Sequence, residues 1–239
     1  MVQTLVLAAG NSLPIFLEAG FTVPKVLKEV DGKTVIARAL ESYVYSPESL
    51  TVVLSKSENA NYRVATEIHS AYPQARIIEV PDDARGALVS ALFGIGELNP
   101  EEPLLIVSGD SEVMGGISQF ISLWVDSGVA GGTVTFPATD PRYSFVKKDL
   151  QGNVAQVVEK VAVSNNATTG VFYFSSVETF KHAATWCLVN NASLNGLFYN
   201  STAVNYLIEQ GSQIAIAEIP KEQYKVWSRP SDFEGKGSN

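Results

Sequence analysis

Charged side chains stand at the ends of several apolar runs, where a folded sheet would present them at its edge. Asp110 follows the apolar residues 103–107 within the sequence SGDSEV. A carboxylate in that place can hold a hard cation that bridges phosphate oxygens, although a Gly-Asp turn that closes a strand is the simpler alternative. Lys25 follows Pro24 after a long first loop. It can neutralise phosphate as a point charge, or it is an ordinary surface lysine.

Glu159 and Lys160 close the run VVEK at the end of a predicted strand. From a rigid strand, Lys160 can bind a phosphate while Glu159 accepts hydrogen bonds from hydroxyl groups. Adjacent strand residues point to opposite faces, so both reach one pocket only through a twist or a bulge. A solvated pair of charges at a sheet edge is the alternative.

Arg85 and Gly86 stand at the start of a predicted helix, in the sequence DDARGALVSAL. Backbone N–H groups at a helix start can meet an anion or the edge of a nucleobase, and Arg85 adds positive charge. An ordinary helix start without a ligand is the alternative.

Apolar runs and helix-length segments alternate through the first half of the chain and predict the elements that position these residues. The expected strands are 4–9, 50–54, 75–80 and 103–107, and the expected helices are 34–43, 58–71 and 85–98. Short strands that are apolar throughout, separated by helices, indicate a parallel sheet covered on both faces. Ligands of such sheets bind beyond the carboxyl ends of the strands, where the candidate residues follow.

The second half adds antiparallel pieces to this sheet. We expect strands at 128–136, 170–176 and 213–219, a hairpin over 143–160 that turns at 149–152, and helices at 177–188 and 202–209. No linker stands out, so we expect one domain over residues 1–239.

Composition excludes several classes of protein. The 239 residues carry a formal net charge of -8 and no basic stripe, which argues against nucleic-acid binding. The single cysteine, Cys187, excludes an intramolecular disulfide, and the two histidines lack partners at zinc-ligand spacing. The apolar start of the chain lacks a basic flank and is too short to cross a membrane or direct export. We therefore expect a cytoplasmic protein with no membrane partner.

Taken in order, several segments resemble the sugar-1-phosphate nucleotidyltransferases. The resemblance is to the short, single-domain, glucose-1-phosphate thymidylyltransferase-like members that are associated with capsule and surface-polysaccharide synthesis, and it runs from about residue 2 to Asp232. The segments that carry it are LVLAAG, GFTVPKVLKEVDGKTVI, ARGALVSAL, PLLIVSGDSEV, YSFVKKDLQGNVAQVVEK, SNNATTGVFYF and VNYLIEQGSQIAI.

The resemblance implies a Rossmann-like α/β fold, with a nucleotide-binding half (1–137) and an antiparallel acceptor-binding half (138–239). It implies transfer of a nucleoside monophosphate from a nucleoside triphosphate to a phosphorylated sugar or alcohol, with Mg²⁺ and release of pyrophosphate, in a chain that associates with copies of itself as many relatives do. The implied nucleotide contacts are Ala8, Ala9, Gly10 and Gly86, with Lys25 at the α-phosphate and Asp110 on Mg²⁺. The implied acceptor contacts are Tyr143, Glu159, Lys160 and Gly170.

Two stretches depart from the pattern of this family. Its phosphate loop reads LAAG-x-G-[ST]-R, whereas Gly10 is followed here by Asn11, Ser12, Leu13 and Pro14, without the second glycine or the arginine. Near the end, WSRPSDF stands where relatives carry a second metal-binding aspartate or a Gly-Thr-Pro-x-Asp stretch. Both losses affect triphosphate and metal handling.

These departures leave more than one function open. The first is an active nucleotidyltransferase in which another cation, with Arg85 as the obvious candidate, replaces the lost arginine. The second is a catalytically impaired protein that binds a nucleotide or sugar phosphate in a regulatory or partner role. The third and weaker one is a glycosyltransferase of similar topology, for which Asp110 and Glu112 offer only an approximate Asp-x-Asp pair.

Overall fold

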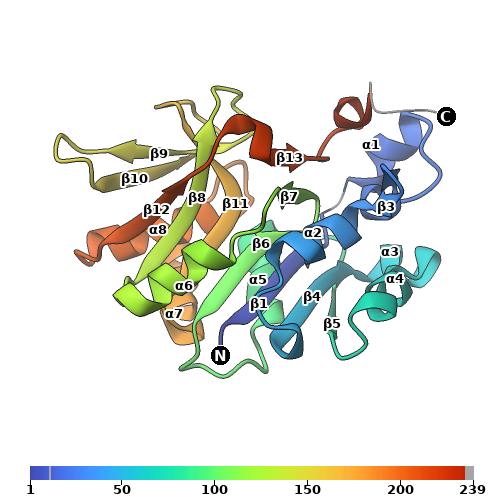
Figure 1. Cartoon of the computed structure of the whole chain (residues 1–239), viewed down its shortest axis with the longest axis horizontal. Helices are drawn as coiled ribbons and strands as arrows, with labels where there is room; N and C mark the ends of the chain where they lie inside the picture. Colours follow the sequence, from blue (N-terminus) through green and yellow to red (C-terminus); the bar gives the residue numbers. More distant parts are fainter. Residues whose placement is uncertain (11, 235–239) are drawn as a thin grey trace.

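The computed structural model describes residues 1–10 and 12–234, which fold around a mixed nine-stranded sheet (Figure 1). The main path has the spatial order β10-β9-β11-β6-β1-β4-β5, and β8 connects β11 to β12. The strands are β1 (Gln3–Ala8), β4 (Leu50–Ser55), β5 (Arg76–Val80), β6 (Leu104–Ser108), β8 (Gly131–Pro137), β9 (Ser144–Lys148), β10 (Val154–Glu159), β11 (Asn166–Phe174) and β12 (Ile214–Glu218). Strands β6, β1, β4 and β5 are mutually parallel, which confirms the predicted parallel core of an α/β fold.

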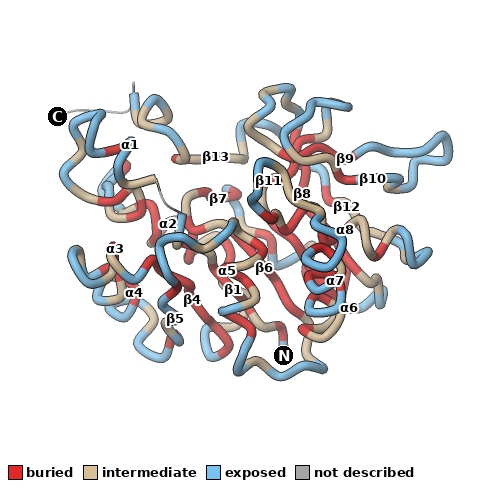
Figure 2. Tube along the Cα trace, turned by 180° about the vertical axis from the view of Figure 1, so that it is seen from behind, coloured by how far each residue is buried: buried red, intermediate tan, exposed pale blue. Residues whose placement is uncertain are grey.

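Helices cover both faces of the sheet. They are α2 (Val35–Tyr43), α3 (Lys56–Tyr62), α4 (Val64–Ala71), α5 (Ala87–Gly94), α6 (Ser118–Ser127), α7 (Val177–Val189) and α8 (Asn200–Glu209). Successive strand residues enter opposite cores, since side chains alternate along a strand. Leu5 belongs to the core that includes residues of α5, α7 and α8, whereas Val6 belongs to the core that includes residues of α2, α4 and α6. The buried residues of the central strands lie between these layers (Figure 2). Burial on both faces explains why these strands read as continuous apolar runs.

The antiparallel portion is built around β11. This strand pairs antiparallel with β6, β8 and β9, so it connects the parallel core to the β9–β10 hairpin. Its pairing with β8 shifts register between Thr168 and Phe172, at Gly170, which has a φ of +83°. That positive φ favours glycine and marks an irregularity in the middle of the strand.

Some elements differ from the sequence-based expectation. The predicted helix 58–71 is two helices, because Arg63 between them adopts a left-handed φ of +55°. The predicted helix 85–98 is shorter, since α5 begins after Gly86. Helix α6 was not predicted. No helix in the described residues has the length and apolar character that crossing a membrane requires.

Short elements join the chain's end to its first loop. Strand β13 (Tyr224–Val226) pairs with β7 (Ser111–Val113), directly after Asp110, and β2 (Glu29–Val30) pairs with β3 (Lys33–Thr34). The 3₁₀ turns are η1 (Lys25–Leu27), η2 (Pro47–Ser49), η3 (Lys221–Gln223) and η4 (Pro230–Phe233). Figure 1 shows the last turn beside α1 (Leu13–Glu18).

Candidate functional site

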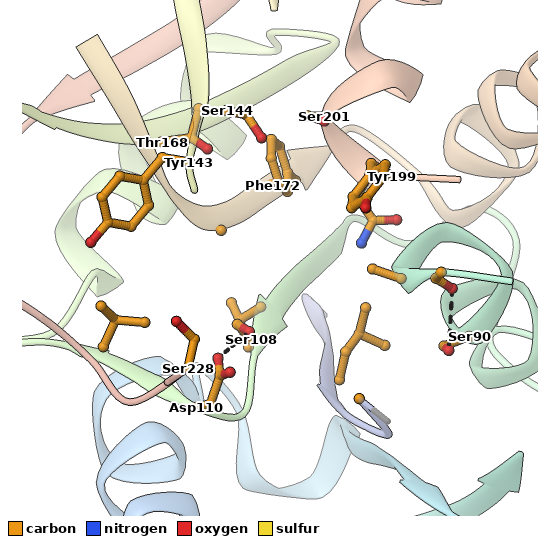
Figure 3. A pocket seen from close by; sticks show the side chains of 18 of the residues that line it. Ser90, Ser108, Asp110, Tyr143, Ser144, Thr168, Phe172, Tyr199, Ser201 and Ser228 are labelled. Carbon is orange, nitrogen blue, oxygen red and sulfur yellow. Dashed lines mark hydrogen bonds between the residues drawn. The ribbon is translucent and has the colours of Figure 1, made fainter. Parts of the chain in front are cut away.

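A cavity of about 560 Å³ opens at the carboxyl ends of β1 and β6, between the parallel core and the β9–β10 hairpin. In Figure 3, Ser108, Asp110 and Ser228 lie on one side of it, and Tyr143, Ser144, Tyr199 and Ser201 lie on the other. All but one of the predicted site residues line this cavity: Ala8, Ala9, Gly10, Lys25, Gly86, Asp110, Tyr143, Glu159, Lys160 and Gly170. The order of the strands therefore brings residues as distant in sequence as Ala8 and Gly170 into one cavity.

Lys25 and Asp110 form an ion pair on the side of the parallel core. The Lys25 Nζ lies 2.5 Å from the Asp110 Oδ2, and both side chains are only 14% exposed. Ser108 donates a hydrogen bond to the other carboxylate oxygen, Oδ1, at 2.6 Å (Figure 3). Burial raises the pKa of Asp110, but the charge and hydrogen bond of Lys25, with the hydrogen bond from Ser108, outweigh it and lower the pKa below its ordinary value. Asp110 is thus held as a carboxylate.

Glu159 and Lys160 reach the same cavity although they are adjacent in sequence. Lys160 directly follows β10 and has a left-handed φ of +55°, which takes it out of the alternation of the strand. Its Nζ donates to the Tyr199 hydroxyl at 2.9 Å and lies 4.8 Å from the centre of that ring. The Glu159 carboxylate accepts hydrogen bonds from the hydroxyls of Ser144 and Ser201. The left-handed conformation of Lys160 thus provides the twist that both side chains need to reach one pocket.

Gly86 has a packing role as well as a place in the cavity. Its φ is +97°, and a Cβ at this position would lie 2.4 Å from the Phe198 carbonyl oxygen. The Leu88 N–H donates to that same carbonyl oxygen at 3.1 Å. Close contact between the start of α5 and the segment before α8 therefore requires glycine here.

Arg85 is the one predicted site residue that is not among the described residues lining the cavity. Its Nε donates to the Gly196 carbonyl oxygen at 3.2 Å, and its Cζ lies 5.4 Å from the centre of the Phe198 ring. This placement gives no support to Arg85 as the replacement for the lost loop arginine.

The first loop contains a helix that the sequence analysis did not predict. Helix α1 starts directly after Ser12, with Pro14 in its first turn, where a missing N–H costs little. Phe16 is fully buried, and its ring packs edge-on against Phe21 at 4.9 Å and Phe233 at 5.8 Å between centroids. Of the residues after Gly10 that differ from the family's phosphate loop, Asn11 lies outside the described part of the chain. This segment is thus packed as a helix against the end of the chain.

Near the end of the chain, Asp232 is hydrogen-bonded to other residues of the protein. Asp232 accepts hydrogen bonds from the backbone N–H groups of Ser228, at 3.0 Å, and Arg229, at 2.8 Å. Its other oxygen accepts from the Arg142 guanidinium at 2.7 Å, and Arg142 lines the cavity beside Tyr143. Asp232 therefore closes a turn and orients Arg142, while Ser228 faces the cavity.

Two further acids lie beyond the ends of β4 and β5: Glu58, which interacts with Lys25, and Asp82, which interacts with Glu58. Burial raises the pKa of Glu58 to about 7, against a smaller opposing effect of Lys25. Asp82 lines the cavity, and a hydrogen bond from the Ser55 hydroxyl, at 2.6 Å, lowers its pKa. At neutral pH Glu58 is therefore partly protonated, whereas Asp110 is the carboxylate that forms an ion pair with Lys25.

The cavity has members that sequence reasoning missed. They include Arg142, Tyr199, Asn200 and Ser201. Ser228 also lines the cavity, but the sequence indicated only that the segment WSRPSDF differs from the pattern of the family. Arg142 directly precedes Tyr143 and was open to prediction from that position. Nothing local marks Tyr199 or Asn200, because they reach the site only through the packing of α8 against β10.

Metal ligands are sparse in this cavity. Residues 1–10 and 12–234 contain no group of three or more His, Cys, Asp or Glu side chains arranged to hold a metal ion. Mg²⁺ in proteins is often held by only one or two carboxylates together with substrate phosphates. Asp110, with the Ser228 hydroxyl on the same side of the cavity, fits that type of site (Figure 3).

Comparison with known proteins settles the fold. No family model and no curated protein sequence matches the chain. Solved structures match over nearly its whole length: a nucleoside-diphosphate-sugar pyrophosphorylase from Vibrio cholerae RC9 has 20% identity, a TM-score of 0.81 and 98% coverage of both chains. The chain has a sugar-1-phosphate nucleotidyltransferase-like fold.

Two further structures support this assignment. A candidate glucose-1-phosphate thymidylyltransferase from Bacillus anthracis, solved with sucrose, has 13% identity and a TM-score of 0.77, over 98% of this chain and 93% of the other. The inositol-1-phosphate CTP transferase from T. maritima has 16% identity and a TM-score of 0.72, over 98% and 92%. At these identities the likeness concerns the fold.

Proposed function

We propose that this chain is a nucleotidyltransferase that joins a nucleoside monophosphate to a phosphorylated sugar or alcohol. The observation that carries the proposal is the meeting of Lys25, Asp110, Glu159 and Lys160 around one cavity beyond the carboxyl ends of the strands. These side chains supply two cations for phosphate groups, a carboxylate for a metal ion and a carboxylate for hydroxyl groups.

In this proposal the two halves of the chain divide the work. Residues 1–137 hold the nucleoside triphosphate near Ala8, Ala9 and Gly10, and residues 138–239 hold the acceptor. Lys160 binds the acceptor phosphate, Glu159 accepts from its hydroxyls, and Tyr143 and Gly170 shape the wall. An acceptor phosphate oxygen then attacks the α-phosphorus, and the bond to the leaving pyrophosphate breaks. Catalysis is mainly positioning and neutralisation of charge, with Lys25 at the α-phosphate.

Asp110 is the residue that would hold Mg²⁺, which neutralises phosphate charge when it is bound. The Lys25 ammonium lies beside this carboxylate and supplies a second positive charge for phosphate. The product, a nucleotide-activated sugar or alcohol, is a precursor for surface-polysaccharide assembly. Nucleoside triphosphate as substrate fits a cytoplasmic location, and we propose self-association as in many proteins of this fold.

Release of pyrophosphate tests this function. The protein is incubated with each nucleoside triphosphate, Mg²⁺ and a panel of sugar 1-phosphates and polyol phosphates. Pyrophosphate should appear with one combination and fall at least about 100-fold in Asp110→Asn and in Lys25→Met, since each removes a charge placed for the transition state. Absence of pyrophosphate across the whole panel contradicts the proposal.

A second candidate function is binding of a phosphorylated ligand without transfer. The observation that favours it is helix α1, which replaces the phosphate loop and is fixed by the buried Phe16. In addition, Ser228 supplies a hydroxyl in place of a second carboxylate. Such a protein would bind the acceptor tightly and show no Mg²⁺-dependent binding of triphosphate in calorimetry.

Restoring the loop residues separates a displaced loop from one that still faces the ligand. Neither Ser12 nor Leu13 is among the described residues that line the cavity. We therefore expect Ser12→Gly combined with Leu13→Arg to leave triphosphate affinity within about threefold, as measured by calorimetry. A gain of tenfold or more, about 1.4 kcal/mol, would show that this segment reaches the triphosphate.

A further inference from the structure

The N-terminus of α8 forms one wall of the cavity, and its residues hold the predicted acceptor-binding side chains. The Tyr199 hydroxyl accepts the hydrogen bond from Lys160, and the Ser201 hydroxyl donates to Glu159 at 2.6 Å. Asn200 lies between these two residues in the sequence and also lines the cavity. Figure 3 shows Tyr199 and Ser201 on this wall.

Asn200 is buried without a partner for its carbonyl oxygen. The residue is 5% exposed, and its Oδ1 forms no hydrogen bond to any described part of the chain. Buried amide groups are nearly always hydrogen-bonded in folded proteins, because an unpaired one loses its interactions with water. Since Oδ1 itself is shielded in this conformation and the residue lines the cavity, rotation of the amide would present this oxygen to a ligand there.

Asn205, on the same helix, differs from Asn200 because both ends of its amide are hydrogen-bonded within the protein. Its Oδ1 accepts from the Val157 N–H at 2.8 Å, and its Nδ2 donates to the Val157 carbonyl oxygen at 2.9 Å. These two bonds fix α8 to β10. Asn200 has no such pair for its oxygen, so support of the helix does not explain it.

The surroundings indicate which ligand group Asn200 would meet. Rotation about the Cβ–Cγ bond exchanges the two ends of the amide, so the ligand group must suit either a carbonyl oxygen or an amide nitrogen. A hydroxyl does so, because it both donates and accepts. The neighbouring Glu159 carboxylate also accepts from hydroxyls, and the Lys160 ammonium attracts phosphate. A phosphorylated polyol or sugar fits this combination.

We propose that Asn200 is a specificity residue that hydrogen-bonds a hydroxyl group of the acceptor, next to the hydroxyl that meets Glu159 and the phosphate that meets Lys160. This inference rests on the proposed acceptor site. It adds a recognition residue that decides which hydroxylated acceptors bind.

Asn200→Leu tests the inference, with Asn205→Leu as the matched control. Leucine has the branching of asparagine but no amide, so Asn200→Leu should raise the melting temperature by about 2 °C or more by removing an unpaired polar group. Asn205→Leu should lower it, because two hydrogen bonds are lost. Calorimetry with α-D-glucose 1-phosphate, myo-inositol 1-phosphate and monodeoxy analogues then measures affinity and discrimination.

The inference expects Asn200→Leu to weaken the best-bound probe at least tenfold and to abolish the preference over one of its deoxy analogues. It is overturned if Asn200→Leu lowers the melting temperature as Asn205→Leu does, or if affinity and discrimination are unchanged. If the unaltered protein binds none of these probes, the pyrophosphate assay with the full acceptor panel decides the proposed function separately. The melting temperature of Asn200→Leu then tests the inference alone. A rise supports an amide that has no partner within the protein, and a fall overturns the inference.

Discussion

The Lys25–Asp110 ion pair, at 2.5 Å, is the shortest ion pair among the described residues. Both partners are largely buried, so each charge has lost most of its hydration and depends on the other. The exposed pair Lys33–Glu41 has a similar separation, 2.7 Å, but remains in water. The two pairs therefore offer a comparison between a buried and an exposed interaction of one geometry.

Lys25→Met should lower the free energy of unfolding by about 3 kcal/mol at neutral pH, because it leaves the Asp110 carboxylate buried without its counter-charge. Lys33→Met, the matched control, should change it by less than about 1 kcal/mol. Urea denaturation of the three proteins measures both values. Equal effects of the two substitutions would show that the Lys25–Asp110 pair is solvated like the surface pair.

Glu58 predicts a pH dependence of stability. Burial raises its pKa from the ordinary value of 4.5 to about 7, so the folded state holds a proton that the unfolded state releases between these values. Its contribution to stability is present below pH 4.5 and is lost as pH rises through about 7. Relative to Glu58→Gln, the unaltered protein should lose about 3 kcal/mol between pH 4.5 and pH 8.

Denaturation of both proteins across this pH range provides the measurement. Glu58→Gln should be the more stable protein at pH 8 and about equal at pH 4.5. Curves that stay parallel would mean that Glu58 titrates with an unshifted pKa.

Residue chemistry was the part of the site most open to prediction. Asp110, Glu159 and Lys160 stand at the ends of apolar runs, and Lys25 follows the long first loop. The family resemblance gave these four residues their expected roles, and all four line the cavity. Arg85 was predicted from its place at a helix start, but its side chain packs on Phe198. Direction of a side chain at a helix start depends on tertiary packing, which the local sequence does not contain.

At the scale of elements, helix α1 is the clearest difference from expectation. Six residues, Leu13–Glu18, are too short to form a stable helix alone, so the helix depends on its tertiary contacts. The aromatic cluster of Phe16, Phe21 and Phe233 provides them. Since Phe233 is more than 200 positions away, no local pattern could have predicted this helix.

Phe16→Ala should lower the free energy of unfolding by about 3 kcal/mol, because it leaves a cavity at a fully buried position. Ile15→Ala is the matched control on the same helix: Ile15 is 59% exposed, and its truncation should change stability by less than about 0.5 kcal/mol. Urea denaturation compares them, and limited proteolysis should cut Phe16→Ala faster between residues 12 and 24. Similar stability of both variants would show that the aromatic cluster does not fix α1.

For the whole molecule, the alternation of strands and helices was sufficient to predict the parallel core and the hairpin. A strand that is buried on both faces reads as a short apolar run, and this signal lies within the local sequence, which explains this success. The branching of the sheet at β11 and the contribution of α8 to the cavity were not predicted, because both depend on pairings between distant segments. The order of motifs, more than any single motif, indicated the fold.

The central claim is that one cavity at the carboxyl ends of the strands binds a phosphorylated acceptor through Lys160 and Glu159. Calorimetric titration with a panel of sugar 1-phosphates and polyol phosphates tests it most directly, on the unaltered protein, Lys160→Met and Glu159→Gln. We expect saturable binding of at least one compound, weakened about tenfold or more by each substitution because each removes a charge-assisted contact. Binding of no compound, or binding that neither substitution weakens, would contradict the claim.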